Sequence, residues 1–184
     1  MKAVFVGGSR NISRLNAEVR KRLDNIIENN LHVLIGDANG ADKAMQRHFE
    51  TKGYRNVEVF CAGGLCRNNL GEWSVRTVAA DSRERDFTFY SAKDRVMTQE
   101  ASVGFMVWDG KSVGTLLNVF RLQTGKKKVV VYISPERQFF ELRDADDWNS
   151  FIAGCDVGLR RKVEQKAALE SPQDRNSAQA TLPL

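Results

Sequence analysis

The feature that most constrains the fold of this chain is an alternation of two apolar patterns. Short runs rich in β-branched residues, such as "KAVFV" at 2–6, predict buried strands. Longer stretches with apolar residues every three or four positions, such as 13–30 with Ser13 as its cap, predict helices. We therefore expect strands at 2–6, 32–36, 57–61, 103–108 and 127–133, and helices at 13–30, 40–53, 92–101, 112–125 and 147–168.

Strands that are apolar along their whole length and alternate with helices form parallel sheets covered on both faces. With right-handed connections, the pattern predicts an α/β fold, a Rossmann-like doubly wound sandwich with a mainly parallel sheet of about five strands. We expect the strand order 3-2-1-4-5, in which ligands bind beyond the carboxyl ends of the first and fourth strands. The 184 residues predict one domain over 1–168 and a flexible tail over 169–184.

The segment 62–92 interrupts this alternation. It contains "AGGLCRNN", "GEWSV" and "ADSRERDFTFY", none of which has a clear period. Such a long irregular span inside a compact domain is usually functional or mobile.

Charge and cysteine content narrow the classes of partner. The formal net charge is +5, but the basic residues are dispersed and no aromatic-rich basic segment or zinc-finger pattern is present, so nucleic acid is an unlikely partner. No run approaches the length of a membrane span, and "MKAVFVGGSR" is typical of a first strand, so we expect a cytoplasmic protein without a membrane partner. The three cysteines lack metal-ligand spacing and are expected to be free thiols, with no metal bound.

Three polar, glycine-containing loops follow predicted strands: "GGSRNIS" (7–13), "GDANGAD" (36–42) and "WDGKSVGT" (108–115). Carboxyl ends of parallel strands share one edge of the sheet, so these loops are expected to meet there. Glycines let backbone amides approach an anion, and the helix start after 112 adds unpaired N–H donors. Neither G-x-G-x-x-G nor a P-loop occurs, and no cofactor is expected. The candidate ligand-binding residues in these loops are Gly7, Gly8, Ser9, Arg10, Gly36, Asp37, Asn39, Gly40, Ala41, Asp42, Trp108, Ser112, Gly114 and Thr115.

Several of these residues have structural alternatives. Asp42 is as suited to complementing a helix dipole as to binding a sugar or base, and Asp37 can brace its turn. Trp108 can stack on a base or pack in the core. In "DRVMTQE", Arg95 is a candidate phosphate ligand, and Glu100 is a candidate nucleophile or acid–base group for a glycosidic bond, with a surface ion pair as its alternative. Asp109 is the second candidate catalytic carboxylate.

The order and spacing of "VFVGGSR", "IGDANGADKAM" and the stretch from "KDRVMTQE" to "GKSVGTLLN" resemble the SLOG superfamily, which is named for the DNA-processing protein DprA and the Lonely Guy phosphoribohydrolases. The match covers about 1–133 and resembles a small bacterial and phage branch. The resemblance implies a Rossmann-like fold and a nucleotide-type pocket. It maps Gly8–Arg10, Gly36 with 40–42, Arg95 with Met97, and Gly114 with Thr115 onto the recurring motifs. Asn118 stands where the Lonely Guy enzymes carry a glutamate.

The first functional hypothesis is a protein that senses or carries a nucleotide or nucleotide-derived small molecule at the carboxyl edge of the sheet, as a possible homo-oligomer. One alternative is an enzyme that cleaves the N-glycosidic bond of a nucleoside monophosphate. A second alternative is a DNA-processing accessory protein that uses the basic surface.

Overall fold

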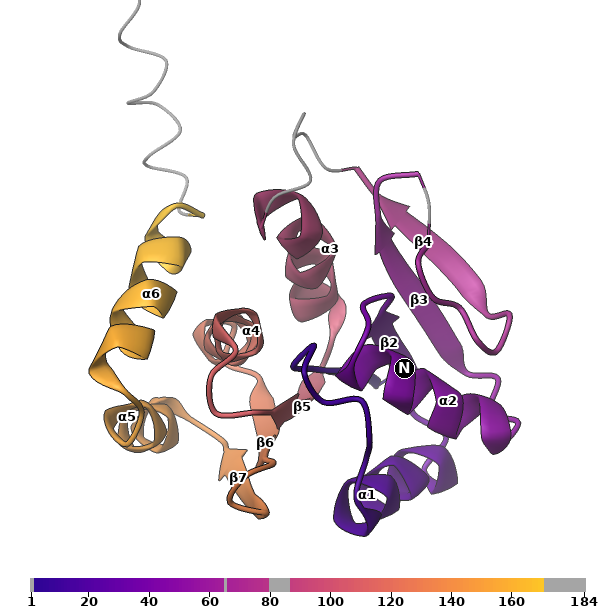
Figure 1. The fold of residues 1–184 in the computed structure, drawn as a ribbon, viewed down its shortest axis with the longest axis horizontal. Coiled ribbons are helices and arrows are strands. Elements are labelled where there is room, and N and C mark those ends of the chain that lie inside the picture. The colour runs from indigo at the N-terminus through magenta and orange to yellow at the C-terminus, as the bar shows by residue number, and fades with distance from the viewer. Residues whose placement is uncertain (1, 65, 80–86, 171–184) are drawn as a thin grey trace, which may run out of the picture.

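The computed structural model describes residues 2–64, 66–79 and 87–170 of the chain. Within them, a twisted central sheet is covered by helices on both faces (Figure 1). The strands are β1 (Ala3–Gly8), β2 (His32–Gly36), β3 (Val57–Ala62), β4 (Ser74–Val78), β5 (Val103–Trp108), β6 (Lys128–Ile133) and β7 (Gln138–Leu142). The helices are α1 (Ala17–Glu28), α2 (Ala41–Thr51), α3 (Phe87–Glu100), α4 (Val113–Thr124), α5 (Ala145–Ala153) and α6 (Val157–Ala168).

The sheet has seven strands in the order β4-β3-β2-β1-β5-β6-β7. All neighbours pair in parallel except β7, which runs antiparallel to β6. The predicted α/β Rossmann-like class is confirmed, and the five predicted strands correspond to β1, β2, β3, β5 and β6 in the predicted order. The order reverses at β1, so the loops after β1 and β5 lie side by side at the carboxyl edge.

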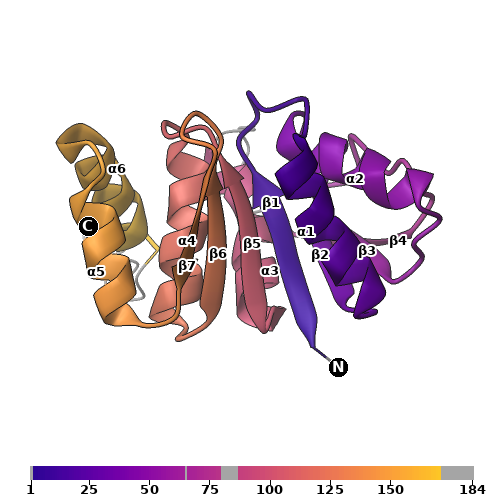
Figure 2. The same cartoon turned by 90° about the horizontal axis from the view of Figure 1, so that it is seen from below.

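Two hydrophobic cores form because successive side chains of each strand point to opposite faces of the sheet. On one face, Val4 and Val6 pack with buried residues of α1 and α2. On the other face, Phe5 packs with buried residues of α3 and α4, and the same core continues to α5 and α6. Figure 2 shows α5 and α6 beyond α4, at the β7 end of the molecule. This two-sided burial explains the uninterrupted apolar character of the central strands.

The structure corrects four predictions of local structure. Both edge strands, β4 and β7, were missed because they are partly exposed and their sequences mix polar with apolar residues. The single helix predicted over 147–168 is two helices, α5 and α6, which begin at the side-chain caps Asp144 and Asp156. The first helix is capped by Asn16 and not by Ser13, because Asn16 Oδ1 accepts a hydrogen bond from Val19 N–H at 2.9 Å.

Two further predictions concern the ends and surroundings of the domain. Most of the expected tail, 171–184, lies outside the described residues, but Glu170 is bound to the body of the domain by an ion pair with Arg121. No helix among the described residues is long and apolar enough to cross a bilayer.

Candidate ligand-binding site

A cavity of about 570 Å³ opens at the carboxyl edge of the sheet, between the loops that follow β1, β2 and β5. We call it the strand-end cavity. Its volume is in the range of small-molecule sites. Its walls come from these loops, from α3 and from the first turns of α4, and they comprise Phe5, Gly7, Gly8, Arg10, Asn11, Ala38, Asp42, Tyr90, Ser91, Asp94, Asp109, Lys111, Ser112, Gly114, Thr115 and Asn118.

Ser9 joins the three loops. Its hydroxyl donates to Asp109 Oδ1 at 3.0 Å and accepts from the Asp109 N–H at 3.0 Å, and it lies 3.3 Å from Thr115 Oγ1. Its carbonyl accepts a hydrogen bond from the Ala41 N–H at the start of α2. Ser9 is fully buried, so these bonds are shielded from water and hold the loops in one arrangement.

The Asp109 side chain stabilises the loop between β5 and α4 by accepting hydrogen bonds from its backbone. Its Oδ1 accepts from the backbone N–H groups of Lys111 at 3.0 Å and Ser112 at 2.7 Å, and Asn11 donates to its Oδ2. Partial burial acts to raise the pKa of Asp109, but these hydrogen bonds outweigh it and hold the pKa below the ordinary value. Asp109 is therefore an ionised structural acceptor whose oxygens are already engaged.

Two glycines permit the close approach of these loops. Gly40 has φ +85°, and a Cβ there would overlap the backbone of Arg10. A Cβ on Gly36 would occupy the space that Asp42 Oδ2 and Lys93 Nζ fill. The loop after β2 therefore needs glycine for two separate reasons: a left-handed backbone at 40 and room for charged side chains at 36.

A group of charged side chains lies in and beside the cavity wall: Asp37, Asp42, Arg67, Lys93 and Asp94. We call it the buried charge cluster because Asp37, Asp42 and Lys93 are buried, whereas Asp94 is half-buried and Arg67 is exposed. Lys93 Nζ is 2.9 Å from Asp94 Oδ1 and 3.9 Å from Asp37 Oδ1. Arg67 binds Asp37 with Nη2 at 2.7 Å, Nε at 3.0 Å and its backbone N–H at 3.0 Å. Lys93 and Asp37 are only 4% and 2% exposed.

Three carboxylates and two cations make up this cluster, so one negative charge is in excess when every group is ionised. The excess falls on Asp42: burial raises its pKa to about 6, with help from Asp94 and Asp37 and against the attraction of Lys93. In Asp37 and Asp94 burial also acts to raise the pKa, but their cationic neighbours prevail and the pKa of each is lowered. Asp42 is therefore the group in the cavity wall that changes protonation near neutral pH.

The polar network continues from the cavity toward α6. Asn118 donates to Asp94 Oδ2 at 3.0 Å, and its own Oδ1 accepts from Arg121 at 2.5 Å. Arg121 forms a two-pronged ion pair with Glu170, which also lies 3.4 Å from Arg95. A continuous set of hydrogen bonds thus connects the cavity wall to the end of the described chain.

Tyr90 forms one wall of the cavity between two arginines. The guanidinium carbon of Arg67 is 4.5 Å from the centre of the Tyr90 ring, and that of Arg10 is 5.3 Å from it. These are cation–π distances. The same Arg67 that binds Asp37 therefore also supports the aromatic wall.

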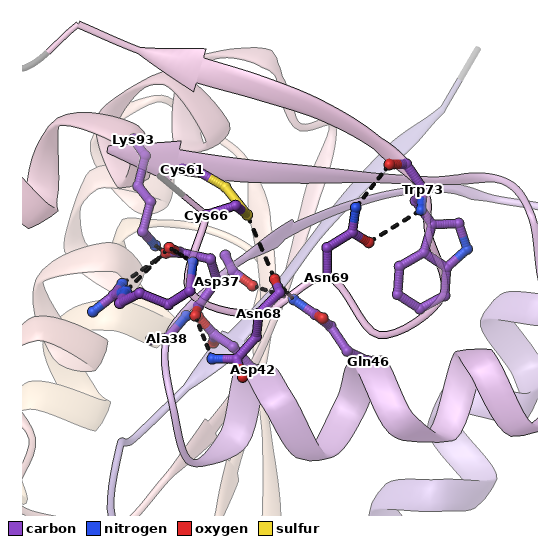
Figure 3. The surroundings of a disulfide bond; sticks show 12 residues. Asp37, Ala38, Asp42, Gln46, Cys61, Cys66, Asn68, Asn69, Trp73 and Lys93 are labelled. Atoms are coloured by element: carbon purple, nitrogen blue, oxygen red, sulfur yellow. Dashed lines mark hydrogen bonds and ion pairs between the residues drawn. A yellow bond between two sulfur atoms is a disulfide. The ribbon is translucent and has the colours of Figure 1, made fainter. Parts of the chain in front are cut away.

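Cys61 and Cys66 form a disulfide beside this cluster, which corrects the expectation that they are free thiols (Figure 3). Cys155 is a free cysteine. The two sulfurs and a carboxylate oxygen of Asp37 lie within 4.8 Å of one another, a grouping that could hold a metal ion if the thiols were reduced. In the disulfide state the two sulfurs are covalently bonded to each other, and the Asp37 carboxylate forms an ion pair with Arg67.

The structure brings most of the predicted binding residues together. Gly7, Gly8, Arg10, Asp42, Ser112, Gly114 and Thr115 line the strand-end cavity, as does Asp109, a predicted catalytic residue. Ser9 and Ala41 are joined in the layer beneath, with Gly36, Asp37 and Gly40 close by. Asn39 is exposed and accepts a hydrogen bond from Asn68 at 3.1 Å.

Three predicted site residues lie elsewhere. Glu100 is at the exposed end of α3, where it pairs with Arg76 at 2.5 Å, so the surface ion pair describes it better than the catalytic role. Arg95 faces Glu170 at the far side of α3. Trp108 is buried against Phe151, with its ring centroid 6.0 Å away, and is a core residue.

Sequence reasoning missed several cavity and cluster residues, chiefly Tyr90, Lys93, Lys111 and Arg67. Tyr90 and Asp94 are four residues apart in α3, so they share a helix face with Met97 and Ala101, both buried. The helix was predicted to begin at 92, two residues too late to include Tyr90. Lys93 gave no signal, because nothing in a sequence distinguishes a buried cation from a surface one. Arg67 is exposed, and its pairing with the distant Asp37 has no local pattern either.

The structure is that of a Rossmann-like α/β protein with a cavity at the carboxyl edge of its sheet. No protein-family model matches the sequence, and no curated protein matches it either. The fold is similar to that of DNA processing protein A from Helicobacter pylori, solved in work on its single-stranded DNA binding mode. The TM-score is 0.55 and the identity 14%, over 91% of this chain and 80% of that chain. At this identity, the similarity establishes the fold.

The same comparison corrects one prediction about partners. Nucleic acid was expected to be an unlikely partner because the basic residues are dispersed along the sequence. A protein of this fold binds single-stranded DNA, so the lack of a basic, aromatic-rich segment does not argue against such a partner. Residues far apart in the sequence, such as Arg10 and Lys111, line one cavity, and a linear scan does not register them as a patch.

Proposed function

We propose that this chain binds single-stranded nucleic acid, with one phosphate-bearing nucleotide seated in the strand-end cavity. The observation that carries the proposal is the composition of the cavity mouth. Arg10 and Lys111, both exposed, line the same cavity as Gly114 in the first turn of α4, and Lys111 directly precedes the N-cap Ser112. A helix N-terminus with adjacent cations favours phosphate through its N–H donors and its dipole.

The segments that resemble the SLOG superfamily, GSR at 8–10, GAD at 40–42 and GT at 114–115, contribute residues to this site. Ser9 and Thr115 fix the loops, and Arg10 and Gly114 present a guanidinium and a backbone without a side chain to the ligand. Tyr90 adds an aromatic wall at the same cavity. Cationic groups that follow the backbone and aromatic groups beside the bases are the usual components of single-strand binding. The similarity to DNA processing protein A supports the same class of ligand.

A free nucleotide is the second candidate ligand. The volume of about 570 Å³ favours it, because that volume is typical of sites for small molecules. The N-glycosidase alternative has less support. Glu100 is outside the cavity, and the carboxylate oxygens of Asp109 accept hydrogen bonds from Ser9, Asn11 and two backbone amides.

The experiment is a fluorescence anisotropy titration with a labelled thymidine oligonucleotide, its duplex and competing mononucleotides, at several salt concentrations. Arg10→Ala and Lys111→Ala are expected to weaken binding roughly tenfold together and to lower the salt slope by about one for each phosphate that is no longer neutralised. Arg161→Ala, at an exposed position of α6, is the matched control and should leave affinity unchanged. Tighter binding of mononucleotide than of oligonucleotide favours the second candidate. Equal weakening in the control, or no binding at low salt, contradicts the proposal.

A further inference from the structure

The disulfide between Cys61 and Cys66 is joined to the cavity by the residue that follows it. Cys61 lies in β3 and is 1% exposed, whereas Cys66 is half-buried and outside any strand. Arg67 is next in the chain, and its backbone N–H and guanidinium both bind Asp37. The bond therefore ties the end of β3 to the segment that carries Arg67.

The contacts of Arg67 reach the cavity wall along two routes, one through its hydrogen bonds to Asp37 and one through its cation–π contact with Tyr90. Asp37 is part of the buried charge cluster, where Lys93 also contacts Asp94 of the cavity wall. The guanidinium of Arg67 also lies against the ring of Tyr90. Figure 3 shows the disulfide directly beside Asp37, with Lys93 directed at the same carboxylate. Arg67 therefore connects the disulfide both to the buried charge cluster and to the aromatic wall at Tyr90.

We infer that the Cys61–Cys66 disulfide is a reversible redox modification site, that its reductant is a dithiol, and that its state sets the affinity of the strand-end cavity. The inference about affinity rests on the proposed function. The inference about the site itself does not.

The chemistry is a thiol–disulfide exchange. A thiolate of the dithiol attacks Cys66 Sγ, the more accessible sulfur, and the S–S bond breaks with Cys61 Sγ as the leaving thiolate. The second thiol of the reductant then attacks the mixed disulfide and releases Cys66. Two protons pass from the dithiol to the two cysteines, and two electrons reduce one disulfide while the reductant becomes a disulfide.

Reduction removes the covalent constraint on the segment before Arg67. The Arg67 N–H and guanidinium are then held to Asp37 by hydrogen bonds alone, and Tyr90 is supported by a less restricted side chain. We expect the oxidised protein to bind an oligonucleotide more tightly, because its cavity wall is already ordered before the ligand arrives. Cys155 belongs to a different cavity, between β5 and α5, and takes no part.

The first test is independent of any ligand. Alkylation and mass spectrometry count free thiols in oxidised and dithiothreitol-reduced protein, and hydrogen–deuterium exchange reports on the Arg67 amide. Reduction is expected to raise the thiol count from one to three and to speed exchange at Arg67 roughly tenfold or more. For Cys155→Ser the thiol count is expected to rise from zero to two, with the same change in exchange at Arg67. Cys61→Ser/Cys66→Ser should exchange like reduced protein with or without reductant. Three free thiols after oxidant treatment, or unchanged exchange at Arg67, overturns the inference.

The second test measures affinity for the labelled thymidine oligonucleotide in both redox states. Reduction is expected to weaken binding roughly fivefold in the wild type and in Cys155→Ser, and to have no effect on the double variant. Equal affinity in the two states of the wild type overturns the claim about affinity. If no form binds but the exchange at Arg67 still depends on redox state, the proposed function fails and the modification site stands. A thermal melt of each form confirms that the compared proteins are folded.

Discussion

Ser9 and Asp109 are one hundred residues apart in the chain and exchange two hydrogen bonds, each 3.0 Å long. This reciprocal pair fixes the loop after β1 to the loop after β5, and it does so with a serine that is fully buried. The edge of the sheet is therefore a single rigid structure and not a set of independent loops.

Ser9→Ala is expected to lower the free energy of unfolding by about 1–3 kcal/mol, because the Asp109 N–H loses its acceptor in a partly buried position. Urea denaturation monitored by circular dichroism measures the change. Ser13→Ala, at an exposed position nearby, is the control and should stay within about 0.5 kcal/mol of the wild type. A Ser9→Ala protein as stable as the control would show that the pair contributes nothing.

Asp42 is expected to make stability depend on pH with a particular sign. Its pKa is about 6 in the folded chain, above the ordinary 3.8, so the folded state holds the proton more strongly than the unfolded state. Its contribution to stability is complete below pH 3.8 and is lost as the pH rises through 6, at a cost of about 3 kcal/mol by pH 8. Asp42→Asn should therefore be more stable than the wild type at pH 8, with the difference vanishing near pH 4. A difference that is the same at both pH values would contradict the assignment.

Ligand binding is expected to respond to the same proton. An anion in the cavity disfavours the ionised form of Asp42, so affinity for an oligonucleotide should rise roughly threefold as the pH falls from about 7.5 to about 5.5. Oligonucleotides with hydroxyl ends are used, since their phosphodiesters do not titrate in this range. In Asp42→Asn the affinity should not vary with pH. A wild-type profile that is equally flat would exclude Asp42 from the ligand's surroundings.

Gly36→Ala is expected to destabilise the chain by about 1–3 kcal/mol, because the new methyl group needs the space of Asp42 Oδ2 and Lys93 Nζ. Thermal and urea unfolding measure the effect. Gly64→Ala is the matched control, since a Cβ there meets no atom within 4 Å. Similar small losses of stability in the two variants would mean that the buried charge cluster rearranges at little cost.

Glu170→Ala is expected to cost about 2 kcal/mol, because the mostly buried Arg121 loses its ion-pair partner and Arg95 loses a neighbouring carboxylate. Urea denaturation measures the difference. Glu164→Ala, at an exposed position of α6, should be near neutral. If the two variants were equally stable, Glu170 would add nothing to the fold, and the folded domain would end at residue 168, as the sequence alone predicts.

The central part of the fold could be predicted from the sequence because its physical cause is local. Continuous apolar runs such as 103–108 belong to strands buried on both faces, and their alternation with helices determines a parallel sheet. The edge strands β4 and β7 could not be predicted in this way, because an edge strand is partly exposed and its pattern resembles that of a loop.

In the candidate site, only the residues in the loops that directly follow strands could be predicted from the sequence. The positions of Ser9, Asp42 and Thr115 follow from the sheet order, so these residues could be grouped before the structure was known. Arg95 and Glu100 could not be placed, because the sequence predicts a helix but does not determine which of its sides faces the cavity. Lys93 shows the limit most clearly. Its charge is balanced by the adjacent Asp94 and by Asp37 and Asp42, which lie about fifty residues earlier in the chain, and no local pattern encodes that meeting.

The central position of β1 has a consequence for the order in which the protein assembles. β1 precedes the other described strands in the chain, its neighbour β5 follows about one hundred residues later, and α4 comes after β5. A nascent chain that ends before Thr115 can pair β1 with β2 but cannot close the edge where the three loops meet. Contacts of such long range slow folding. The edge around the strand-end cavity is thus completed late, and a chain that ends before α4 lacks one wall of that cavity.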